Sequence, residues 1–81
     1  MIGSPHIRLV INQVVELDAE LGNWQFTPPD VFKDVLNPAA QPDPWMKAVI
    51  SVVAEATMTG QNVDIEVAGT EREWAMKVTN R

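Results

Sequence analysis

Apolar positions in the middle of the chain have the spacing of an α-helix. From 45 to 58 nearly every residue is apolar, and four polar residues recur at intervals of four: Lys47, Ser51, Glu55 and Thr59. This spacing gathers them into one narrow stripe, so the rest of the helix surface must be covered. We predict a helix here that is central in the domain or lends one face to a partner. It ends at Gly60, a residue typical of helix C-termini.

The C-terminal part has the period of two that is typical of strands. Residues 63–67 alternate between apolar and acidic positions, and residues 74–78 alternate again after a turn. We therefore expect an antiparallel hairpin. The alternative is a last helix, because Thr70 followed by Glu73 has the spacing of a capping box.

The N-terminal pattern over residues 7–21 fits both a helix and a strand. Its β-branched residues favour a strand. Its length, Ser4-Pro5 before it and Gly22-Asn23 after it favour a helix, which we predict. A short helix over 28–36 follows Thr27-Pro28, again a capping residue before proline.

These elements predict a single small domain over residues 1–81, of the α+β class. Two longer helices and one short helix would pack on a small antiparallel C-terminal β-hairpin. If residues 7–17 form a strand instead, the sheet gains a third strand at the N-terminus.

Composition restricts how so small a domain is stabilised. The 81 residues include no cysteine and one histidine, His6, which excludes disulfides, thiolate zinc sites and thiol catalysis. Small domains without such support often rely on self-association. The nearly all-apolar central helix strengthens this expectation, so we expect a homodimer or a protein partner.

The formal charge of −5 bears on partners and location. The six basic residues are scattered, whereas nucleic-acid binding needs a clustered basic face, so we expect no direct contact with nucleic acid or membranes. No apolar run approaches the roughly 20 residues of a membrane span, and no signal peptide is evident. We expect a cytoplasmic protein.

The sequence contains no constellation typical of catalysis. There is no glycine-rich phosphate loop, GxSxG or HExxH motif, and the single histidine has no recognisable partner. We therefore expect a non-enzymatic protein with no cofactor and no metal site.

Two groups of residues are candidates for partner binding. Trp24 and Phe26 lie in a proline-flanked loop with Phe32 nearby, and aromatic anchors often dominate interface energy. The simpler interpretation is that the aromatic rings form the core. The second group is the acidic run Glu16, Asp18 and Glu20, which could also be an ordinary solvated face.

We therefore expect a small acidic protein-interaction or regulatory domain that acts through a hydrophobic surface and self-associates. The alternative is an acidic inhibitor that mimics nucleic acid, of an anti-defence or repressor-blocking type. Its support is that the intervals 9–32 and 48–71 contain acids but no basic residue.

Overall fold

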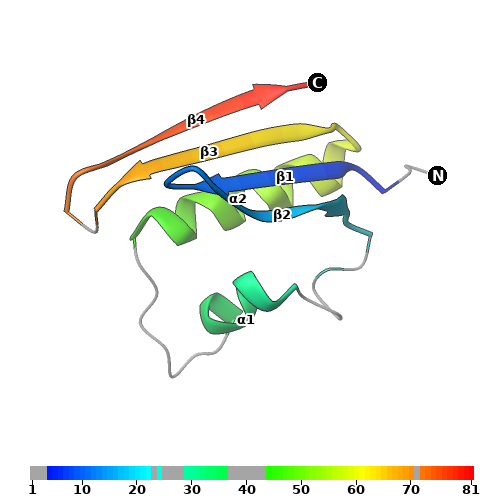
Figure 1. Ribbon diagram of the computed structural model, residues 1–81. Coiled ribbons are helices and arrows are strands. Elements are labelled where there is room, and N and C mark those ends of the chain that lie inside the picture. The colour runs from blue at the N-terminus through cyan, green and yellow to red at the C-terminus, as the bar shows by residue number, and fades with distance from the viewer. Residues whose placement is uncertain (1–3, 23, 25–28, 37–43, 71) are drawn as a thin grey trace.

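The computed structural model describes residues 4–22, 24, 29–36, 44–70 and 72–81. In chain order, their elements are β1 (His6–Ile11), β2 (Val14–Glu20), α1 (Asp30–Leu36), α2 (Pro44–Thr59), β3 (Val63–Gly69) and β4 (Trp74–Asn80). The strands form one mixed sheet in the order β2-β1-β3-β4 (Figure 1). β1 and β3 run parallel in its centre, and each pairs antiparallel with an outer strand. The parallel neighbours β1 and β3 cannot be joined by a tight turn and need a crossover. The chain makes it after β2, through α1 and α2.

The predicted arrangement of two longer helices on a two-stranded hairpin is wrong. Residues 7–21 do not form a helix: they lie in the hairpin of β1 and β2, so the N-terminus supplies two strands of a four-stranded sheet. The turn is made by Asn12 and Gln13, both with positive φ (47° and 69°). Two left-handed residues are the mark of a type I′ turn, whose twist matches that of paired strands.

The C-terminal strands do pair as an antiparallel hairpin, from Val63 with Asn80 to Gly69 with Trp74. The Thr70–Glu73 pair closes the turn rather than opening a helix. Thr70 donates its N–H to the carbonyl of Glu73 (2.8 Å), and its hydroxyl accepts the N–H of Glu73 (3.2 Å). The alternative of a last helix is therefore wrong.

The prediction of a helix that ends at Gly60 is confirmed. α2 ends at Thr59, and Gly60 has φ 73°. The N–H groups of Gly60 and Gln61 both donate to the carbonyl of Ala56, at 2.8 and 3.1 Å. A left-handed residue here lets two amides satisfy a carbonyl that the end of the helix would otherwise leave unpaired.

The core lies between the sheet and the helices, and Figure 1 shows α2 running behind β1 and β3. β1 and β3 contribute alternate residues, as strands with one covered face do. The buried hydrophobic residues form one cluster: Ile7, Leu9, Leu21, Trp24, Phe32, Met46, Val49, Val53, Ala56, Val63, Ile65 and Val67.

Candidate functional site

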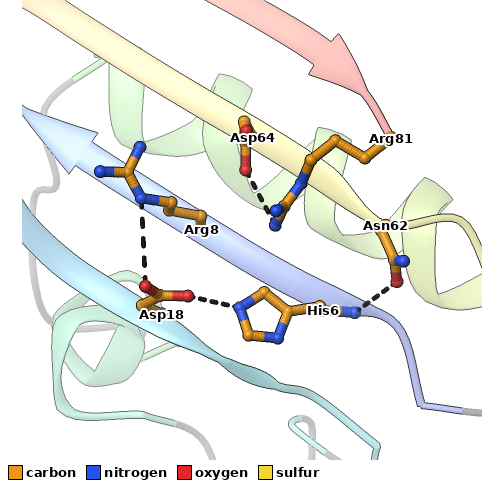
Figure 2. Close-up of polar contacts among 6 residues, drawn as sticks. All are labelled: His6, Arg8, Asp18, Asn62, Asp64 and Arg81. Atoms are coloured by element: carbon orange, nitrogen blue, oxygen red, sulfur yellow. Dashed lines mark hydrogen bonds and ion pairs between the residues drawn. The ribbon is translucent and has the colours of Figure 1, made fainter.

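A cluster of charged side chains lies on the sheet face opposite the core. His6 and Arg8 alternate with the fully buried Ile7 and Leu9, so they point away from the helices. Asp18 of β2, the cross-strand neighbour of Arg8, contacts both of them (Figure 2). Its carboxylate accepts a hydrogen bond from His6 Nε2, and its other oxygen lies 4.0 Å from Arg8 Nε.

The hydrogen bond from His6 lowers the pKa of the Asp18 carboxyl below its usual value of 3.8. Burial opposes this shift to a lesser degree, and the charges of His6 and Arg8 add to it. A lowered pKa in the folded state means that folding favours the ionised form of Asp18.

We expect Asp18→Asn to reduce stability at neutral pH and to make no difference in strong acid. Because the pKa is depressed in the folded state, the stabilisation by Asp18 is complete above the unfolded pKa, near 3.8, and is lost as the pH falls through the lower folded pKa. Urea unfolding midpoints of both proteins across a pH series measure this. In the His6→Ala background the Asn substitution should matter much less; an equal loss there would contradict the assigned contact.

The same face carries a second ion pair, between β3 and the end of the chain. Arg81 Nη2 lies 3.0 Å from Asp64 Oδ1, although the two atoms do not have hydrogen-bond geometry. Asn62 Oδ1 accepts the backbone N–H of His6 at 2.8 Å and so joins β1 to the start of β3 (Figure 2). Acids and bases are thus matched across the strands. Among the described residues, no group of three or more His, Asp or Glu is placed to hold a metal ion.

The aromatic residues proposed as partner anchors are buried where the structure describes them. Trp24 is 5% exposed and Phe32 is fully buried. Their rings meet edge to face with centroids 5.9 Å apart, and Trp24 Nε1 donates to Thr57 Oγ1 on α2 (3.4 Å). Both therefore contribute to the core in this structure, which agrees with the simpler interpretation, while Phe26 lies outside the described residues.

The three acids proposed for partner binding all lie on β2, and all are exposed. Asp18 and Glu20 are the cross-strand neighbours of Arg8 and His6. Glu16 is the extra residue of a β-bulge. Leu9 pairs with Leu17 and the next residue, Val10, pairs with Val15, so Glu16 has no partner on β1. β2 is an outer strand, and acids along an edge keep other strands from pairing with it.

The opposite edge of the sheet is formed by β4, the last strand in the sheet order. Arg81 donates its backbone N–H to the backbone carbonyl of Asn62 (2.9 Å). This bond continues the β3–β4 pairing by one residue pair beyond Val63 and Asn80. Backbone groups of successive strand residues point to alternate sides, so the odd-numbered residues of β4 bond to β3. Four residues therefore direct their N–H and C=O groups outward: Trp74, Met76, Val78 and Asn80.

An open groove of about 250 Å³ lies beside this edge, between α2 and the strands. It is lined by four apolar residues, Val52, Ala56, Val63 and Val78, and by three polar ones, Glu55, Gln61 and Asn80. Val78 is 41% exposed, a large value for a valine on the helix side of a sheet. The helices thus cover β1 and β3 better than they cover β4.

Sequence reasoning did not identify Met76 or Val78 as interaction candidates. Their alternation within residues 74–78 predicted a strand with one apolar face, which is correct. A strand with an apolar face is normally covered by its own domain, so the pattern contained no sign that this one lies at an incompletely covered edge.

Fold and surface together define a small domain with a mixed four-stranded sheet covered on one face and with one apolar edge. The chain belongs to the family described as a domain of unknown function (DUF8277), which matches residues 6–81. No curated protein and no solved structure matches it. Within the described part of the chain, neither helix is long and apolar enough to cross a membrane.

Proposed function

We propose that the protein is a non-enzymatic interaction domain that binds an extended segment of a protein partner by strand addition to β4. The observation that carries the proposal is the outer edge of β4: a seven-residue strand with outward backbone groups, next to an apolar groove. Strand addition uses these two features, since backbone hydrogen bonds supply affinity and side-chain pockets supply specificity.

The contrast between the two edges supports this choice. β2 carries Glu16, Asp18 and Glu20 along seven residues, whereas Lys77 is the only charged residue within β4. Charged edges discourage pairing with another chain, and uncharged apolar edges permit it. The edge that is left open is therefore β4.

The groove adds a place for side chains of the added strand. Its apolar lining includes Val52 of α2 and Val78 of β4, and a strand paired with β4 would direct alternate side chains toward them. Covering Val78 would also remove some exposed apolar surface from water, which adds to the affinity that the backbone hydrogen bonds supply.

The alternative function, mimicry of nucleic acid, gains no support from the arrangement of the acids. Asp18 is paired with His6 and Arg8, and Asp64 with Arg81. A mimic needs uncompensated negative charge, and these carboxylates are partly neutralised within the sheet.

The substitution Val78→Pro tests the proposal. Proline removes one outward N–H but no bond to β3, and edge strands tolerate it in such positions. We expect the variant to keep its fold, measured by circular dichroism and thermal unfolding. Each protein is then used as bait in a lysate of the native host, and the captured proteins are identified by mass spectrometry. The variant should fail to capture the proteins that the wild-type chain captures, including any native copy of this chain.

The matched control is Val78→Thr, which keeps both the outward N–H and the β-branched shape and should retain the same proteins. Equal capture by the folded proline variant would show that β4 is not the binding edge. Capture of nothing above empty resin by the wild-type chain would also count against the proposal.

A further inference from the structure

We propose that the strand added to β4 is β4 of a second copy, paired antiparallel about a two-fold axis at Met76. The two sheets would then join into one continuous sheet of eight strands. This inference rests on the proposed function, because it names the occupant of the same edge.

The charges around β4 are complementary to themselves. Glu73 directly precedes the strand, Lys77 is its central residue, and Arg81 directly follows it; all three are exposed, as is Arg72 before Glu73. Antiparallel pairing places the beginning of one strand beside the end of the other. Glu73 of each copy therefore lies near Lys77 of the other, and near Arg81, which also pairs with Asp64 of its own chain.

The register at Met76 pairs apolar residues with each other and keeps the two lysines apart. An axis at Met76 places Trp74 opposite Val78 of the second copy, and Ala75 opposite Lys77. The Trp74–Val78 pair, like Met76 with its own copy, joins residues whose backbone groups point outward, as hydrogen-bonded antiparallel pairs require. An axis at Lys77 would instead place two lysines directly opposite, which is destabilising.

Self-pairing would also cover the outward backbone groups of β4 and the exposed side chain of Val78. The side chain of Trp74 from the second copy would cover Val78 and approach the groove beside Val52. A two-fold interface is closed, so it ends at a dimer. Pairing of β4 with the acidic β2 edge of another copy would instead leave two open ends and produce longer chains.

The oligomeric state of the purified protein is the first test. Light scattering with size-exclusion chromatography over a concentration series should give twice the chain mass of 9.0 kDa at high concentration. Val78→Pro removes two intermolecular hydrogen bonds per dimer and should weaken the dimer about tenfold or more, whereas Val78→Thr should change it little.

Single cysteines test the register cleanly, because the chain has no cysteine of its own. Under mild oxidation, Met76→Cys should form a covalent dimer. Thr79→Cys is the control on the same strand. The two copies of residue 79 lie far apart on opposite sides of the axis, so this variant should not form a covalent dimer. Mixing Ala75→Cys with Lys77→Cys gives an independent reading, since these residues face each other in the closer, non-hydrogen-bonded pair.

Three results would overturn the inference. A monomer at all concentrations would remove the second copy as occupant, while loss of captured proteins with Val78→Pro would still support binding at β4. A ladder of species beyond the dimer would indicate head-to-tail pairing. A dimer unaffected by Val78→Pro would place the self-contact elsewhere on the molecule.

Discussion

Replacing Phe32 with alanine is expected to cost about 3–5 kcal/mol of the free energy of unfolding. Phe32 is fully buried in α1 and meets the ring of Trp24 edge to face. The loss is of the same order as the whole stability of a domain of this size, about 4–12 kcal/mol. Urea unfolding followed by tryptophan fluorescence should show a large fall in the midpoint, or an unfolded protein already in buffer.

Phe32→Leu is the matched control, since leucine refills most of the cavity and should cost much less. The comparison also decides between the two interpretations of the aromatic residues. If Phe32→Ala stayed as stable as the wild type but lost its partner, the ring would be an anchor at the surface and the core described above would be wrong.

Gly69→Ala is expected to destabilise the protein by about 3 kcal/mol or more, although it adds one methyl group. Gly69 has φ +123°, a conformation that L side chains rarely adopt. A Cβ here would lie 2.1 Å from the carbonyl oxygen of Glu73 and 2.7 Å from the Cα of Trp74, which are backbone atoms of the turn into β4. The strands must separate there to admit it.

Gly69 also links the β3–β4 hairpin to the β1–β2 hairpin through the side chain of Asn12. Its N–H donates to Asn12 Oδ1 at 2.9 Å, and its carbonyl accepts from Asn12 Nδ2 at 3.1 Å. A shift of Gly69 would break this pair of bonds between the β1–β2 turn and the end of β3. The added strain and the lost bonds therefore act in the same direction.

Thermal unfolding of Gly69→Ala beside Gly22→Ala measures this effect. A Cβ at Gly22 would approach only the hydroxyl of Ser4, at 3.0 Å, at the end of a side chain that can rotate away. We expect the Gly22 variant to unfold close to the wild type and the Gly69 variant far below it. Similar midpoints for both would mean that the turn between β3 and β4 has a different backbone conformation.

Local patterns were sufficient for some elements of the fold. The helix that ends at Gly60 follows from the four-residue spacing of its polar positions, and its C-terminal glycine makes bonds within its own last turn. The alternation over residues 74–78 likewise predicted β4. In these cases the signal and the structure both lie within a few consecutive residues.

Residues 7–21 show where local reasoning fails. Their apolar positions match a helix stripe as well as a strand, and the outcome depends on pairing with β3, more than 50 residues later in the chain. Asn12 could have indicated the turn, because asparagine tolerates positive φ. The following Gln13 is not a usual partner for it in such turns, which concealed the signal.

The sequence by itself determined a largely apolar α2, alternating C-terminal strands, and the absence of cysteine for a disulfide or thiolate site. Only the tertiary structure decided that Trp24 is buried, that Asp18 meets His6 and Arg8, and that β4 is an edge beside a groove. The physical reason is that burial, ion pairing and edge position depend on neighbours distant in sequence. An alternating pattern specifies one apolar face of a strand, but not whether the domain covers that face.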